Sequence, residues 1–217
     1  MARFLSTYPP LFRWLPVDVL VAWPHACKNK AYNPEYDRIQ WEDNHEHFQA
    51  WCEGRTAVPI VDAAMRQLNT VGWMHNRCRM STASFLAKHL LIYWRLGEKY
   101  FMQHLIDGDF ASNNGGWQWS VGSGNDASPW FRIFNPWTQS EKVDPQGDYI
   151  RTYVKEIEGL DNSKLHSPHL KCNKTELEQM GYSQRRLSNI DLLGICKCRT
   201  ISLNSLGRDF SRVSRRL

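Results

Sequence analysis

Apolar residues recur every three or four positions through the middle of the chain, and this spacing constrains the fold more than any other feature of the sequence. In the segment VPIVDAAMRQL the apolar stripe consists of Val58, Val61, Met65 and Leu68. A period near 3.6 residues is that of an α-helix with one buried face. The pair Thr56 and Pro59 predicts that this helix begins close to residue 59.

A second helical pattern covers residues 75–96, with a stripe made of Met80, Ser84, Ala87 and Leu91. We expect Gly97 to interrupt this helix and EKYFMQHLI to resume it. Residues 115–135 are rich in glycine, serine and asparagine, which predicts a loop, and residues 146–154 predict another short helix. Because no run of useful length alternates between apolar and polar residues, the predicted fold class is all-α.

Length and composition narrow the class of protein further. The chain of 217 residues is 42% hydrophobic, which suffices for one substantial core. No run of about 18 apolar residues occurs, so we expect no membrane span. The six cysteines are scattered, which predicts a reduced intracellular protein. A zinc site at His166, His169 and Cys172 is disfavoured, because no second thiolate follows at finger spacing.

Charge and tryptophan content divide the chain into two parts. Residues 1–162 carry 16 Lys and Arg against 18 Asp and Glu, whereas residues 163–217 carry 11 against 4. All ten tryptophans lie between Trp14 and Trp137. We interpret the end of the chain as a basic, solvated tail that we expect to be disordered, with contact to nucleic acid as the alternative.

Residues 107–120 read DGDFASNNGGWQWS, a dense mixture of carboxylates, amides, paired glycines and indoles. Glycine lets a flat ligand approach the backbone, and Asn and Asp supply donors and acceptors for ring heteroatoms. Trp117 and Trp119 are two positions apart, so on a helix they cannot point the same way. On chemistry alone, a core position is the better-supported interpretation of these tryptophans.

Together with TAVPIVDAAMRQL and GWMHNRCRM, this motif resembles the flavin-binding region of the DNA photolyase/cryptochrome family. The resemblance is closest to class I cyclobutane pyrimidine dimer photolyases and covers the later half of the family's helical flavin domain. It implies an incomplete helical FAD-binding domain at residues 19–182, flanked by an unmatched segment at 1–18 and the basic tail at 183–217.

The resemblance implies that one group of residues contacts the cofactor FAD. Asp107, Gly108 and Asp109 match a motif that lies along the flavin ring, and Arg79 matches the arginine that pairs with Asp107. Asn113 matches the residue facing flavin N5. Plant cryptochromes carry aspartate at that place, so Asn113 favours repair over signalling.

Two further groups are implied by the same resemblance. The family's electron-transfer chain from flavin to surface is matched by Trp117, Trp94 and Trp41. The contacts to DNA and to the flipped-out lesion are matched by Asn76, Arg77, Met80 and Trp119. Photolyases for the (6-4) lesion use a histidine pair here, whereas WMHNRCRM offers only His75, so the expected substrate is the cyclobutane dimer.

The implied activity is light-driven DNA repair, in which reduced FAD donates an electron that splits the dimer without a metal or a general acid. We expect a monomer that acts on damaged DNA containing pyrimidine dimers, in the nucleus or, alternatively, the mitochondrion. Two other functions stay open: a cryptochrome-like blue-light photoreceptor, and a non-enzymatic remnant that binds DNA or a protein partner.

The sequence departs from the family at both ends of the resemblance. FRWLPVDVL stands where the family has a helix that contacts flavin and lesion, and Pro16 disfavours that helix. SQRRLSNIDLLGICKC replaces the family's continuation after Tyr182, which suggests a truncated or frame-shifted coding sequence. No glycine-rich loop opens a helix to grip a pyrophosphate. We therefore expect the chain expressed alone to bind FAD weakly or not at all and to show no repair.

Overall fold

The structure is a computed structural model, and it describes residues 21–22, 24–28, 30–31, 37, 39–123 and 133–182. Among these residues the only β contact is an isolated parallel bridge between Glu42 and Ile92. The all-α prediction is therefore confirmed, whereas the predictions for residues 1–18 and 183–217 lie outside the described residues.

The helical elements, in order, are η1 (Pro24–Cys27), α2 (His45–Cys52), α3 (Pro59–Val71), α4 (Asn76–Ser84), η3 (Phe85–His89), α5 (Trp94–His104), α6 (Phe110–Val121), α7 (Pro136–Val143), α8 (Asp148–Tyr153), η4 (Lys155–Ile157), α9 (Asn162–Leu165), α10 (Pro168–Lys171) and α11 (Lys174–Gln179).

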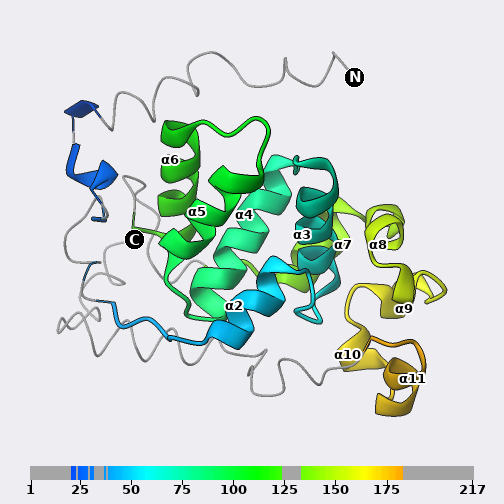
Figure 1. Ribbon diagram of the computed structural model, residues 1–217. Coiled ribbons are helices and arrows are strands. Elements are labelled where there is room, and N and C mark those ends of the chain that lie inside the picture. Colours follow the sequence, from blue (N-terminus) through cyan, green and yellow to red (C-terminus); the bar gives the residue numbers. More distant parts are fainter. Residues whose placement is uncertain are drawn as a thin grey trace, which may run out of the picture.

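Helix α4 lies at the centre of the packing, between α3 and α6 (Figure 1). Helix α5 packs against α6, and α7 and α8 both pack against α3. None of the helices in this part of the chain is both long enough and apolar enough to cross a membrane. This arrangement sets α4, α5 and α6 side by side, and these helices carry most of the predicted site residues.

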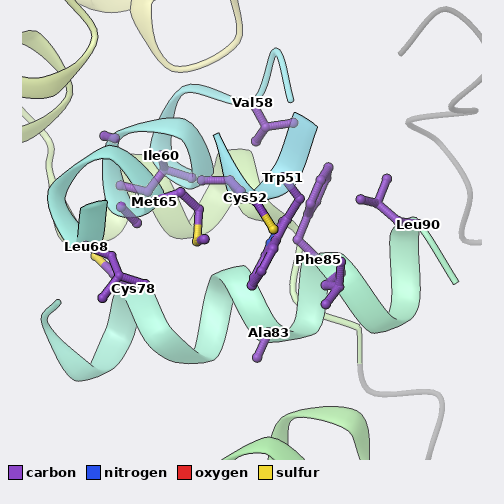
Figure 2. Packing of buried hydrophobic residues seen from close by; sticks show 14 of the residues in the cluster. Trp51, Cys52, Val58, Ile60, Met65, Leu68, Cys78, Ala83, Phe85 and Leu90 are labelled. Carbon is purple, nitrogen blue, oxygen red and sulfur yellow. The ribbon is translucent and has the colours of Figure 1, made fainter. Parts of the chain in front are cut away.

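The first predicted stripe forms part of the core. Val58, Val61, Met65 and Leu68 are each at most 1% exposed, and α3 begins at Pro59 as predicted. Figure 2 shows Trp51, Met65 and Leu68 directed toward α4. The ring of Trp51 also stacks on Phe101 of α5, with centroids 5.8 Å apart. The predicted stripe is therefore confirmed as buried, but Ile60, Asp62, Ala63 and Ala64 between its members are buried as well, so the first two turns of α3 are enclosed on every side.

The second predicted helix is broken at a different place from the one expected. Helix α4 continues into the π-helical turn η3, and the break falls at residues 90–93, where Leu91 adopts a left-handed φ of 55°. The backbone N–H of Glu42 donates to the carbonyl of Leu91 at 2.7 Å, so a tertiary contact stabilises this break. The prediction that Gly97 interrupts the helix is wrong, because Gly97 lies within α5.

The predicted loop over residues 115–135 is also wrong in its first part. Helix α6 runs through Gly115 and Gly116 and ends only at Gly122, whose φ is 81°. Trp117 and Val121 on this helix are buried, and tertiary packing of this kind outweighs the low helix propensity of glycine. Residues 124–132 lie outside the described part. The short helix predicted at 146–154 is confirmed as α8.

His89 makes the stability of the fold depend on pH. Its ring stacks on Phe85 with centroids 5.2 Å apart, and its Nδ1 is buried without a hydrogen-bond partner among the described residues. Burial lowers the pKa of His89 from 6.5 to about 4. As the pH falls below 6.5, the unfolded chain therefore takes up a proton at His89, whereas the native state does not. The contribution of neutral His89 to the free energy of unfolding is fully present above pH 6.5. It falls by on the order of 3 kcal/mol as the pH is lowered toward 4.

Urea unfolding of the chain at pH values between 6.5 and 4 measures this loss. His89→Gln stays neutral over the whole range, so its free energy of unfolding should decline less steeply than that of the wild type. Equal declines in the two proteins would show that His89 is not the group responsible.

Candidate functional site

An ion pair joins α4 to the loop between α5 and α6. Nη2 of Arg79 lies 3.0 and 2.9 Å from the two carboxylate oxygens of Asp107, and its Nε donates to the carbonyl of Met74 at 2.8 Å. The two side chains are 25% and 39% exposed. The structure thus places Arg79 and Asp107 in direct contact, at a surface that a ligand can reach.

The next two residues of the loop, Gly108 and Asp109, are both exposed. Oδ1 of Asp109 accepts from the backbone N–H of Ser112 at 2.8 Å and caps the N-terminus of α6. A Cβ at Gly108 would lie 3.2 Å from the carbonyl oxygen of Leu105, closer than most side chains allow. The backbone at Gly108 is therefore exposed directly after Asp107, and Asp109 fixes the start of α6.

Asn113 lies one turn into α6 and is half-buried. Its Nδ2 donates to the backbone carbonyl of Glu98 at 3.0 Å. This bond assigns the orientation of the amide, and it leaves Oδ1 as the atom able to accept from an N–H group of a ligand.

A buried polar network holds this part of α6 against α5. The carboxylate of Glu98 accepts from Nη1 of Arg95 at 3.2 Å and from Nδ2 of Asn114 at 2.6 Å, and Oδ1 of Asn114 accepts from Gln118 at 2.9 Å. Burial raises the pKa of Glu98, and the bonds from Asn114 and Arg95 oppose that rise. Sequence analysis missed Glu98, because nothing local marks a partner 15 residues away from Asn113.

The three tryptophans predicted to form a chain differ in burial. Trp117 is 2% exposed and Trp94 is 3% exposed, whereas Trp41 is half-buried. The six-membered ring of Trp117 packs over Gly97, which lies one turn after Trp94 on α5. The ring of Tyr93 lies 6.4 Å from Trp94 and 5.8 Å from Trp41. Tyr93 and Trp94 thus stand at the start of α5, and Trp41, from the segment before α2, lies against Tyr93 on the partly exposed side.

Trp51 is an aromatic neighbour of Trp117 that sequence analysis did not include. Its centroid lies 6.1 Å from that of Trp117, and its Nε1 donates to the carbonyl of Thr82 at 3.1 Å. The Nε1 of Trp117, in contrast, is buried without a hydrogen-bond partner in the described part of the chain. A fully buried tryptophan at a helical position looks like any core residue in the sequence, so no signal distinguished Trp51 in advance.

The residues predicted to contact DNA lie on two adjoining helices. Asn76 and Arg77 are exposed at the start of α4, and Nδ2 of Asn76 lies 3.6 Å from the sulfur of the half-buried Met80. Trp119 on α6 is also half-buried, and its ring lies 6.1 Å from Phe134. Because α4 packs against α6, these groups belong to the same helical layer.

The site combines amide, carboxylate and guanidinium groups. Among the described residues, no group of three or more His, Cys, Asp or Glu side chains is placed to hold a metal. His166 is hydrogen-bonded through Nδ1 to the hydroxyl of Ser140 at 2.7 Å. The amide oxygen of Asn113 and the accessible Arg79–Asp107 pair suit a planar ring with N–H and carbonyl groups.

These polar groups belong to a helical layer that also carries the buried aromatic residues Trp94 and Trp117. The family model described as the FAD binding domain of DNA photolyase matches residues 11–189. The chain therefore belongs to this family, whose cofactor is FAD.

Relatives and solved structures agree with this assignment. The chain is 58% identical to a deoxyribodipyrimidine photo-lyase from Escherichia coli over 145 residues, which cover 67% of this chain and 31% of the relative. It is 54% identical to one from Neurospora crassa over 173 residues, which cover 76% of this chain and 28% of that relative. The crystal structure of a class III photolyase from Agrobacterium tumefaciens superposes with a TM-score of 0.81 at 41% identity, covering 91% of this chain and 42% of the other. The chain thus spans about a third of the length of the two curated relatives.

Proposed function

We propose that this region acts in light-driven, FAD-dependent splitting of cyclobutane pyrimidine dimers in DNA. The observation that carries the proposal is the orientation of Asn113, whose amide oxygen is left free by the bond to the carbonyl of Glu98. The accessible Arg79–Asp107 pair joins α4 to the loop that leads into the helix of Asn113, and the chain belongs to the photolyase FAD-binding family.

The residues of the site suit the reduced form of the cofactor. When bound, FAD supplies the light-absorbing and electron-donating group. Oδ1 of Asn113 would be the acceptor for an N–H group of the ring, and an amide has no ionisable proton to give back. The guanidinium of Arg79, held by Asp107, places a positive charge near a ring that carries negative charge when reduced.

The buried tryptophans suit transfer of electrons from the surface to the site. Trp117 is shielded from water, and its Nε1–H has no hydrogen-bond acceptor among the described residues. Burial of this kind favours transfer of an electron from another ring over loss of the indole proton. Trp94 at the start of α5 and the partly exposed Trp41, which precedes α2, are the predicted sources of that electron, and the ring of Tyr93 contacts both.

Trp119 is proposed to stack on the extruded lesion, while Asn76 and Arg77 contact the DNA. Trp119→Ala should weaken binding of dimer-containing DNA by about 1–3 kcal/mol, or about 5- to 150-fold, because stacking on an aromatic ring contributes that much per base. Binding is measured by fluorescence anisotropy at fixed salt. Trp137→Ala is the control, since Trp137 is also half-buried but lies on α7 beside His169. Equal effects of the two variants would remove Trp119 from the lesion site.

The proposed function is tested in a chimera in which residues 39–182 replace the matching segment of the Escherichia coli photo-lyase. We expect the purified chimera to contain FAD and to repair thymine dimers in light but not in the dark. Bound FAD without light-dependent repair would favour a photoreceptor, and a colourless, folded chimera would favour a module without cofactor. In parallel, the 217-residue chain alone is expected to retain little FAD, which absorbance of the purified protein measures directly.

A further inference from the structure

Tyr93 lies between two of the tryptophans that the proposed electron-transfer chain contains. It directly precedes Trp94, and its centroid is 6.4 Å from that of Trp94 and 5.8 Å from that of Trp41. The three rings therefore form a continuous series of aromatic contacts from the buried Trp94, through the half-buried Tyr93, to the half-buried Trp41.

The backbone fixes this series. The bridge between Glu42 and Ile92, with its bond from the Glu42 N–H to the Leu91 carbonyl, holds the segment carrying Trp41 against the segment carrying Tyr93. Tyr93 then occupies the N-cap position of α5, with φ −55° and ψ 115°. Since a capping residue is not yet helical, its side chain is free to lie against a neighbouring segment.

Tyr93 also has an outlet for its phenolic proton. Oxidation of a tyrosine at neutral pH requires that the phenol lose this proton, so a redox-active tyrosine needs water or a base nearby. Tyr93 lines a surface cavity of about 520 Å³ together with the acidic residues Asp37, Glu42 and Asp43. Trp117 differs in this respect, because its buried Nε1–H has no described acceptor.

We propose that Tyr93 is a further redox residue of the chain and donates an electron to oxidised Trp94. This proposal rests on the proposed electron-transfer function. In the step, one electron moves from the Tyr93 phenol to the Trp94 radical cation, and the phenolic O–H breaks. Its proton passes to water or a carboxylate in the cavity. The products are neutral Trp94 and a neutral Tyr93 phenoxyl radical. A thiol in solution then returns one hydrogen atom to the phenoxyl oxygen, and two thiyl radicals combine as a disulfide.

The experiment uses the 217-residue chain without flavin or DNA. A photo-excited ruthenium tris(bipyridine) complex, quenched irreversibly by a cobalt(III) ammine, oxidises accessible aromatic side chains. Transient absorption and electron paramagnetic resonance then separate indole from phenoxyl radicals. In the wild type we expect the indole signal to decay as a phenoxyl signal rises. In Tyr93→Phe most of the phenoxyl signal should be lost, and the indole radical should live longer.

Two further variants test whether the effect is specific to the phenol of Tyr93. Tyr153→Phe removes a half-buried phenol that packs on Tyr149, away from the cavity, and should behave as the wild type. Tyr93→Trp keeps a bulky oxidisable ring, so it should pass the electron without forming a phenoxyl, even if Tyr93→Phe folds poorly.

Unchanged phenoxyl yield and indole lifetime in both Tyr93 variants would overturn the proposal. So would an equal loss of phenoxyl in Tyr153→Phe. Because neither flavin nor DNA takes part, failure here leaves the repair assay of the chimera unaffected. Conversely, an inactive chimera does not change the radical signals of the isolated chain.

Discussion

Replacing Trp117 with phenylalanine in the chimera is expected to remove most light-driven reduction of bound flavin, while repair starting from chemically reduced flavin stays nearly unchanged. Phenylalanine is far harder to oxidise than tryptophan, so it interrupts the supply of electrons to the site. Repair itself needs only the already reduced cofactor. Flavin absorbance under steady illumination measures the first property, and dimer repair after reduction with dithionite measures the second.

The route of the electrons is resolved by two further substitutions. Trp94→Phe should reproduce the loss seen for Trp117→Phe, because Trp94 is the predicted next donor. Trp51→Phe is the control: the centroid of Trp51 lies 6.1 Å from that of Trp117, but Trp51 is fully buried in the core. If Trp51→Phe blocked light-driven reduction and Trp94→Phe did not, the path would leave Trp117 through the core. Equal loss of reduction and repair in Trp117→Phe would indicate that Trp117 is only structural.

The helical architecture could be predicted from the sequence wherever one face of a helix is buried. The stripe from Val58 to Leu68 is buried as predicted, but its period did not reveal that Ile60, Asp62, Ala63 and Ala64 are enclosed too, because neighbouring helices cover the other sides of α3. The break after η3 could not be predicted in this way. It depends on Leu91 in a left-handed conformation, which is held by Glu42, almost fifty residues earlier in the chain. Local propensity contains no information about such a tertiary contact.

The candidate site shows a similar division. The resemblance to a known family supplied Arg79, Asp107 and Asn113, and the structure places Arg79 against Asp107. Periodicity could not have paired residues on different elements. The sequence did not reveal that Asn113 is held by the backbone carbonyl of Glu98. It also did not reveal that the ring of Tyr93 contacts both Trp41 and Trp94. Neither interaction requires a particular sequence spacing, so only the three-dimensional arrangement reveals them.

Gly97→Ala is expected to destabilise the fold by about 3 kcal/mol or more, at or above the upper end of the usual cost of overpacking. A Cβ at this position would lie 2.2 Å from Cη2 and 2.8 Å from Cζ2 of Trp117, and 2.6 Å from Cδ2 of Leu86. Trp117 is 2% exposed and has Trp51 and Phe101 as ring neighbours, so its ring cannot move aside without disturbing the core. The usual preference of helices for alanine over glycine, about 1 kcal/mol, acts in the opposite direction and is too small to compensate. Urea unfolding of the wild-type and variant chains measures the difference.

A double substitution tests whether the indole is the cause. Phenylalanine lacks the outer ring of Trp117 that carries Cη2 and Cζ2, so Trp117→Phe makes room for the new methyl group. Gly97→Ala should therefore cost much less in the Trp117→Phe background than in the wild type, with a coupling energy of about 1–3 kcal/mol between the two sites. Additive effects would mean that Gly97 is required for its backbone or for Leu86. Strong coupling would show that Gly97 is required because it makes room for the ring of Trp117. Although propensity predicts a helix break at Gly97, this glycine lets α6 place Trp117 against α5, one helical turn from Trp94.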